Sequence, residues 1–390
     1  MTKLVCHRCK KVVTPEEHAS CPECKGDPSV VYPFRNSDEF LRQRIPPVLE
    51  ERERLGLNGL VGGLECVIIN TEPGRQQPAV DELLRYTGLS YAEGFEGNNL
   101  RTCVLKAEGP ADFLVQSRLT SANPFHEHNV FPKSGRLPNT RLETFVFSTP
   151  DIAEYVAIQK KRGATFMTED IVETPGFSFI QTTPSRYTSN SLGFIQWHGE
   201  RGNWATHESA PLDWRFAKPD LPHLASIKHL DHAATRVHAE NRDAAIIEFM
   251  RLTNYNFDFA IYVQALNSIT NVARLSDKDF AMVFTSGIIP FNFDAESGPT
   301  ENFIHNYGAR THHIAFCTDN IDETFAAIKA DGMEFLIELV GSPDEGLKQT
   351  FTVASHNTML VNEYIQRYGG FDGFFTKSNV TDLTRATEKQ

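Results

Sequence analysis

The stretch Arg141-Leu-Glu-Thr-Phe-Val-Phe-Ser-Thr-Pro-Asp-Ile-Ala-Glu154 recurs about 169 residues later as Arg310-Thr-His-His-Ile-Ala-Phe-Cys-Thr-Asp-Asn-Ile-Asp-Glu323. The match continues through four further pairs, which are Ala157 and Ala326, Lys160 and Lys329, Gly163 and Gly332, and Phe166 and Phe335. In each copy an apolar run predicts a β-strand, and an amphipathic helix and a second strand follow. A chain that matches itself at a fixed shift contains two modules of one design.

The repeat extends in both directions. Upstream, Leu64-Glu-Cys66 matches Leu230-Asp-His232, and a helix is expected after each, over 79–86 and over 242–252. Downstream, Gly193-Phe-Ile-Gln196 matches Glu363-Tyr-Ile-Gln366. The sequence therefore predicts an α+β protein with two tandem βαβββ-repeat modules at 61–200 and 224–370, joined by a linker at 201–223.

The two copies differ at three matched positions. The second module carries His232, His313 and Glu363 where the first has Cys66, Thr144 and Gly193. Two imidazoles and one carboxylate form the facial triad that binds Fe(II) and leaves coordination positions open for substrate and oxygen. The sequence therefore predicts an iron site in the second module alone.

Strand geometry predicts which histidine is the ligand. Because side chains alternate between the two faces of a strand, His232 and Ala234 should share a face, and His312 should point away from His313. A competing cluster, His126-Glu-His128, lies in a Pro- and Asn-rich loop without a counterpart in the repeat, so it is disfavoured.

The N-terminal segment carries two Cys-x-x-Cys pairs. Cys6, Cys9, Cys21 and Cys24 can close a tetrahedral shell around one Zn(II), which predicts a structural four-cysteine zinc ribbon at 1–26. A redox dithiol pair or an iron site are the alternatives. A helical connector is expected at 27–60, capped by Ser37 and interrupted at Pro46-Pro47.

Composition favours small-molecule partners. The 390 residues carry a formal net charge of -12, which repels nucleic acid, so no nucleic-acid partner is expected. No apolar run approaches the roughly 20 residues that span a bilayer, so no membrane partner is expected. The expected location is the cytoplasm. A homodimer is also expected, as is a protein partner for the ribbon.

Several strands resemble those of one enzyme family. Leu230-Asp-His-Ala-Ala-Thr-Arg-Val237, Thr311-His-His-Ile-Ala-Phe316, Gln349-Thr-Phe-Thr352 and Glu363-Tyr-Ile-Gln-Arg367 resemble the signature strands of the 4-hydroxyphenylpyruvate dioxygenases and hydroxymandelate synthases. That family belongs to the vicinal oxygen chelate superfamily. The resemblance implies Fe(II) on His232, His313 and Glu363.

The resemblance also implies the rest of the site. Gln349, Ser268 and His312 are expected to act in catalysis. The substrate is expected to contact Ser268, Asn292 and Gln349, and also Phe371, Phe374 and Phe375 of a gating segment at 371–390. The chain departs from the family at His312, where Gln is usual, and at Ser297-Gly298, where a Ser-Gln pair is usual. These changes are expected to alter which ring substituent is accepted.

The implied reaction takes an aromatic 2-oxo acid and O2, and couples oxidative decarboxylation to hydroxylation of the same substrate. Two alternatives stay open. One is extradiol cleavage of a catechol by the same ligands, which a basic His305 or His312 in the pocket would favour. The other is a non-enzymatic adaptor that binds a metal or ligand and reaches its partner through the zinc ribbon.

Overall fold

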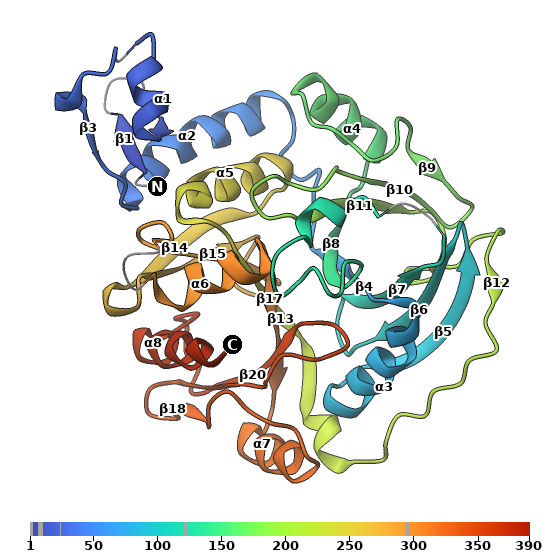
Figure 1. The fold of residues 1–390 in the computed structure, drawn as a ribbon. Coiled ribbons are helices and arrows are strands. Elements are labelled where there is room, and N and C mark those ends of the chain that lie inside the picture. The colour runs from blue at the N-terminus through green and yellow to red at the C-terminus, as the bar shows by residue number, and fades with distance from the viewer. Residues whose placement is uncertain (1–2, 7–10, 24, 121–122, 293–296) are drawn as a thin grey trace.

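The computed structural model describes residues 3–6, 11–23, 25–120, 123–292 and 297–390. Two curled β-sheets lie side by side, helices pack around them, and a small N-terminal unit sits beside α2 and α5 (Figure 1). No helix in these ranges is both long and apolar enough to cross a membrane.

The two sheets repeat one strand order. The first runs β12-β5-β6-β7-β4-β8-β11-β10-β9 and the second runs β14-β15-β16-β13-β17-β20-β19-β18. The first sheet contains β4 (Leu64–Asn70), β5 (Ser90–Gly97), β6 (Leu100–Lys106), β7 (Asp112–Arg118), β8 (Arg141–Ser148), β9 (Val172–Glu173), β10 (Phe177–Gln181), β11 (Ser191–Trp197) and β12 (Ala210–Pro211). The second contains β13 (Ile227–Arg236), β14 (Asn256–Val263), β15 (Ser268–Arg274), β16 (Ala281–Ser286), β17 (Arg310–Thr318), β18 (Val340–Ser342), β19 (Leu347–Phe351) and β20 (Val361–Arg367). The two-module prediction is confirmed, and β12 of the linker adds an edge strand to the first sheet.

The central strands carry the same directions in both modules. The pairs β4·β7 and β8·β11 are parallel and β4·β8 is antiparallel. The equivalent pairs β13·β16, β17·β20 and β13·β17 match them.

Helices occupy equivalent places in the modules. The first module has α3 (Gln76–Tyr86) and α4 (Ile152–Lys161), and these match α5 (Arg242–Leu252) and α7 (Ile321–Ala330) of the second. Helices α6 (Gly298–Tyr307) and α8 (Lys377–Ala386) have no counterpart among the described helices of the first module. The matched glutamines Gln196 and Gln366 make the same contact in the two copies. Gln196 accepts a hydrogen bond from the first N–H of α4 at 3.0 Å, and Gln366 accepts one from the first N–H of α7 at 2.8 Å. Each module thus ties its helix to its last central strand.

One face of each sheet enters a core that both modules share. Phe147 of β8 packs edge-on against Phe249 and Tyr255 of the second module, and Phe113 of β7 stacks on Phe316 of β17. The two modules are therefore packed through a continuous apolar interior.

The opposite faces differ. In the first module Cys66, Val146, Phe177 and Trp204 form a closed apolar cluster, and Trp204 also donates to Asp112 at 2.7 Å. In the second module the strands carry smaller side chains on that face, Ala234, Val272, Ala281 and Val283, and Phe374 of the C-terminal segment packs against them. The linker tryptophan fills the first module, whereas the second retains space.

The N-terminal unit is a small sheet of β1 (Leu4–Cys6), β2 (Val12–Val13) and β3 (Val31–Pro33), with α1 (Pro15–Ser20). Cys6 ends β1 and is buried, and Cys21 follows α1. Cys9 and Cys24 lie outside the described residues, so the zinc site stays a prediction.

Helix α2 (Asp38–Arg54) corrects the expected connector. The helix begins after Ser37, as predicted, but it continues through Pro46 and Pro47, so the predicted interruption is wrong. Leu41 and Val48 are buried in the shared core and α2 packs on α5. These contacts outweigh the two backbone donors that the prolines remove.

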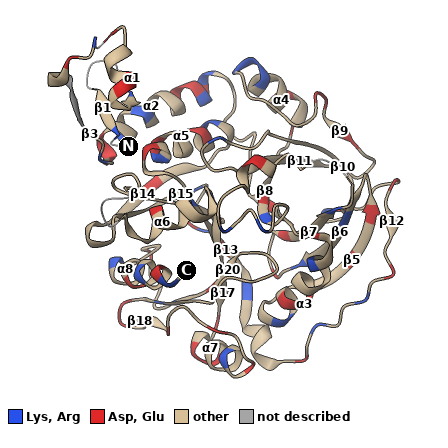
Figure 2. Ribbon diagram, in the orientation of Figure 1, with Lys and Arg blue, Asp and Glu red and all other residues tan. Residues whose placement is uncertain are grey.

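Charged residues are spread over the molecule. Basic and acidic residues are interspersed along α2, where the basic ones are all Arg, and across the outer helices (Figure 2).

Candidate metal centre

Three adjacent strands carry the candidate ligands. In the strand registers, Ala315 of β17 lies opposite His232 of β13 on one side and opposite Glu363 of β20 on the other. His313 lies opposite Ala234. Both alanines are fully buried and have only a methyl group, so the pairing leaves room between the ligands.

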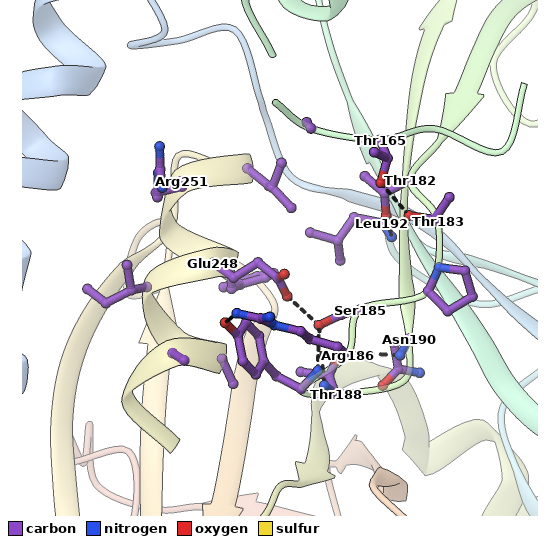
Figure 3. A pocket seen from close by; sticks show the side chains of 18 of the residues that line it. Thr165, Thr182, Thr183, Ser185, Arg186, Thr188, Asn190, Leu192, Glu248 and Arg251 are labelled. Carbon is purple, nitrogen blue, oxygen red and sulfur yellow. Dashed lines mark hydrogen bonds between the residues drawn. The ribbon is translucent and has the colours of Figure 1, made fainter. Parts of the chain in front are cut away.

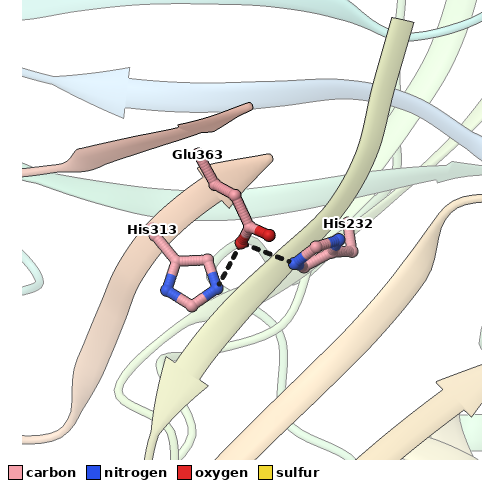
Figure 4. Close-up of side chains that lie close together, drawn as sticks. All are labelled: His232, His313 and Glu363. Atoms are coloured by element: carbon pink, nitrogen blue, oxygen red, sulfur yellow. Dashed lines mark hydrogen bonds and ion pairs between the residues drawn. The ribbon is translucent and has the colours of Figure 1, made fainter. Parts of the chain in front are cut away.

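The three side chains converge, as Figure 4 shows. His232 Nε2 lies 3.1 Å and His313 Nε2 lies 3.3 Å from the same Glu363 oxygen, Oε2. The candidate ligand atoms all lie within 4.8 Å of one another. In the described part of the chain this is the one group of three or more His, Cys, Asp or Glu side chains arranged to share a metal.

An acidic partner orients His232. Its Nδ1 lies 2.7 Å from Asp231 Oδ2, and Arg367 donates to both oxygens of that carboxylate, at 2.5 and 3.1 Å. Burial would raise the pKa of Asp231, but the bonds from His232 and Arg367 outweigh it and hold the pKa well below its usual range. The ionised Asp231 accepts a hydrogen bond from the protonated Nδ1 of His232. The other ring nitrogen, Nε2, therefore faces Glu363.

A chain of hydrogen bonds orients His313. His312 Nε2 lies 2.7 Å from the side-chain oxygen of Gln390, which only accepts, so this nitrogen carries the proton. Burial, together with the charge of Arg236, lowers the pKa of His312 well below its usual value, so its Nδ1 is an acceptor. That atom lies 2.8 Å from His313 Nδ1. His313 therefore donates from Nδ1 and presents Nε2 to the site.

The predicted direction of His312 is wrong. Strand pairing passes from Ala234 opposite His313 to Thr235 opposite Thr311, so His312 is the extra residue of a β-bulge. A bulge breaks the alternation of faces and turns the side chain toward its neighbour. The first module has the same bulge at Glu143, between Thr144 and Leu142.

The donor set fits a divalent cation. With Nδ1 protonated on both histidines, two Nε2 lone pairs and a carboxylate oxygen face one another across 3.1 and 3.3 Å. Such an arrangement is stable only with a cation or a proton between the acceptors. Gln349 holds the other oxygen of Glu363 by donating to Oε1 at 2.5 Å. His232, His313 and Glu363 would therefore hold the metal, with open positions on the cavity side.

A small cavity of about 50 Å³ adjoins the triad. It brings together five of the predicted residues, His313, Glu363, Gln349, Ser268 and Phe375. The rest of its wall is Arg236, Thr270, Val283, Thr285, Thr300, Phe351, Val380, Leu383, Thr384 and Thr387. Val380, Leu383 and Thr384 belong to α8, so this helix forms one side of the cavity.

Other predicted residues lie elsewhere. Asn292 is exposed and does not line the cavity, and neither does Phe371. His312 lies behind His313. Phe374 is buried beside the triad, with its ring centroid 5.6 Å from that of His232, so it supports the ligand from behind.

The sequence analysis missed Arg236. Arg236 lies four positions after His232 on β13. Because side chains alternate between the faces of a strand, the argument that grouped His232 with Ala234 also places Arg236 on the same face. That signal was present in the sequence.

A larger cavity of about 590 Å³ lies between the modules and contains none of the candidate ligands. Thr182, Ser185 and Arg186 line it from the first module, and Glu248 and Arg251 from α5 (Figure 3). Ser185 donates to the half-buried Glu248 carboxylate there.

Two tandem modules with this strand order, one of them carrying a His-His-Glu set, have the vicinal oxygen chelate fold. No protein-family model matches the chain, and no curated protein matches its sequence. Solved structures do resemble it.

A mutant of 4-hydroxymandelate synthase from Streptomyces coelicolor aligns with a TM-score of 0.63 and 16% identity, over 84% of this chain and 98% of that one. A xylose isomerase-like TIM barrel/4-hydroxyphenylpyruvate dioxygenase fusion protein aligns with a TM-score of 0.61 and 14% identity, over 90% of this chain and 58% of the fusion. At these identities the likeness concerns the fold.

Proposed function

We propose that the protein is an Fe(II)-dependent dioxygenase that acts on an aromatic 2-oxo acid, coupling its oxidative decarboxylation to its own hydroxylation. The observation that carries the proposal is the convergence of His232 Nε2, His313 Nε2 and Glu363 Oε2 beside a buried cavity. Iron bound there would supply three further coordination positions, enough for the two chelating oxygens of a 2-oxo acid and for O2.

The protein's own groups prepare this site. Asp231 and the His312 bond fix the tautomers of both histidines, and Gln349 fixes the carboxylate. Phe351 packs against His313 with ring centroids 4.7 Å apart, and Phe375 lies 5.1 Å from His232. These apolar walls exclude water from a reactive centre.

Substrate entry requires movement of one wall. A volume of about 50 Å³ is far below the roughly 300–1,000 Å³ of ordinary ligand pockets. Helix α8 and the turn that follows it close the cavity through a few contacts, among them the bond from Asn379 of α8 to Gln349 and the bond from Arg236 to Thr387 of the turn. An outward shift of α8 would admit the substrate, as expected of a gate.

The fold comparison supports this choice over other reactions, because one similar structure is named as a 4-hydroxymandelate synthase and the other contains a 4-hydroxyphenylpyruvate dioxygenase. The extradiol alternative needs a basic side chain in the pocket. Neither His305, which is exposed, nor His312 lines the cavity.

Oxygen consumption tests the proposal. The protein, reconstituted with Fe(II), is mixed with 4-hydroxyphenylpyruvate or phenylpyruvate, and O2 uptake and CO2 release are measured together. We expect one CO2 per O2, abolished in His313→Ala and retained in His207→Ala, a control on an exposed histidine of the linker. Absence of uptake with any aryl 2-oxo acid would refute the proposal, and uptake with catechol alone would favour ring cleavage.

A further inference from the structure

Arg236 is a buried cation in the wall of the candidate active site. It ends β13, is 4% exposed, and lines the same cavity as His313 and Glu363. It lies four positions after His232 on the strand, which places their Cα atoms about 13 Å apart. The first module has the neutral Asn70 at the matched position.

The contacts of Arg236 leave its charge without an acidic partner. Its two terminal nitrogens donate to the Pro299 carbonyl at 3.3 Å and to the Thr387 hydroxyl at 3.0 Å, and the guanidinium lies over Phe303. Within the described ranges no ion pair joins it to a carboxylate. Burial lowers the pKa of Arg236 to about 9, so it is still protonated at neutral pH.

Other buried arginines show the contrast. Arg242 pairs with Asp38, and the half-buried Arg118 likewise pairs with an acid, the buried Glu143. Arg52, Arg141 and Arg310 have no acid partner, but they donate to backbone carbonyls and line neither cavity described above. Arg236 combines a buried, uncompensated charge with access to a ligand cavity, a combination that is costly unless an anion binds there.

The surroundings of Arg236 are rich in hydroxyl groups. Strand pairing places Thr285 opposite Arg236 and Thr270 opposite Thr285, and both threonines line the cavity. The Thr285 hydroxyl is buried without a hydrogen-bond partner. A guanidinium flanked by an unsatisfied hydroxyl is suited to a carboxylate, which accepts several hydrogen bonds.

We propose that Arg236 binds an anionic group at the end of the substrate remote from the metal, so that the preferred substrate is a 2-oxo acid bearing a second carboxylate. This inference rests on the proposed function for the chelating end of the substrate. An aromatic ring with the two acid groups on opposite sides would present one to the metal ligands and the other to Arg236. Arg236 is then the residue that determines specificity for the distal substituent.

Binding measurements on matched ligands test the inference. Affinities of phenylpyruvate, 4-hydroxyphenylpyruvate and 4-carboxyphenylpyruvate are measured by anaerobic calorimetry on the Fe(II)-loaded protein. We expect the 4-carboxy compound to bind at least ten times more tightly than phenylpyruvate. Arg236→Gln should abolish this preference and Arg236→Lys should retain part of it, while Arg385→Gln, on an exposed α8 side chain, should leave it intact.

Two results would overturn the inference. One is a wild-type protein without preference for the second carboxylate. The other is an Arg236→Gln variant that loses affinity equally for all three acids, which would place Arg236 on the chelating carboxylate. Thermal unfolding of each variant checks that the fold is intact, and Arg236→Lys provides the measurement if Arg236→Gln does not fold.

A metal-free measurement separates this inference from the proposed function. Benzoate should bind the metal-free wild type and not Arg236→Gln. If no 2-oxo acid supports O2 uptake but benzoate binding still depends on Arg236, the proposed function fails while the anion site stands. If benzoate does not bind the metal-free wild type, the anion site is refuted.

Discussion

Single residues behind the ligands set the state of the candidate metal centre. Burial would lower the pKa of His232, yet the Glu363 charge and the Asp231 bond outweigh burial and raise it to about 9. Burial, with the charges of His232 and Arg236, lowers the pKa of His313 well below its usual value. The pKa of His232 is therefore raised and that of His313 is lowered in the metal-free protein. The hydrogen bond to Asp231 accounts for part of that difference in pKa.

Asp231→Asn should weaken metal binding without removing a ligand. The amide is neutral and no longer favours the Nδ1-protonated tautomer of His232, and loss of such a partner typically costs 10–100-fold in affinity. Competition with a chromophoric chelator measures the change. Asp319→Asn, on an exposed carboxylate near the end of the adjacent strand, is the control and should bind metal normally. Unchanged affinity in Asp231→Asn would show that Asp231 does not orient the ligand.

The sequence was sufficient to select the triad residues, because the first module has Cys66, Thr144 and Gly193 where the second has ligands. It was not sufficient for His312. The bulge that turns His312 toward His313 depends on how β13 and β17 pair, and alternation within one strand contains no sign of it. Arg236 was accessible to the same alternation argument that grouped His232 with Ala234.

At the scale of elements, the first module lacks the His-His-Glu set, and side chains also fill the face where that set would lie. A Cβ added to Gly193, the position matched to Glu363, would lie 2.9 Å from Val146 Cγ2 and 3.0 Å from Phe179 Cε2. Trp204 from the linker completes this cluster. The sequence showed that the first module has no His-His-Glu set, but it did not indicate that a linker residue would pack on the matched face.

Gly193→Ala should destabilise the protein by about 1–3 kcal/mol, because the new methyl group overpacks β10 and β11. Gly199→Ala is the matched control, since its added Cβ would meet its nearest neighbour at 3.5 Å, an ordinary contact. Chemical denaturation measures both free energies of unfolding. Equal stabilities would contradict the view that the first module is filled.

At the scale of the whole molecule, the two modules unfold as one unit if the shared core is the main source of stability. The connector helix reinforces this union. The buried Arg52 of α2 donates to the carbonyls of Met250, Asn254 and Tyr255 in the second module. The sequence predicted a helical connector at 27–60 that is interrupted at Pro46-Pro47. It predicted none of these contacts, because they depend on how distant segments pack.

Arg52→Met should lower the free energy of unfolding by about 2–4 kcal/mol, because it leaves buried carbonyls without donors. Arg54→Met, on an exposed side chain of the same helix, should have little effect. All three tryptophans precede the second module, so their fluorescence reports the first module, while release of bound iron reports the second. Both signals should share one midpoint in each protein, and separate midpoints would show that the modules unfold independently.

The central claim is that His232, His313 and Glu363 hold an iron ion that a 2-oxo acid chelates. Its most direct test is anaerobic titration of the Fe(II)-loaded protein with 4-hydroxyphenylpyruvate, observing the weak visible charge-transfer band of a chelated keto acid. The account predicts a band that saturates at one substrate per chain, is absent in His313→Ala and persists in His207→Ala. A wild-type protein without the band, or a His313→Ala variant that keeps it, would contradict the account.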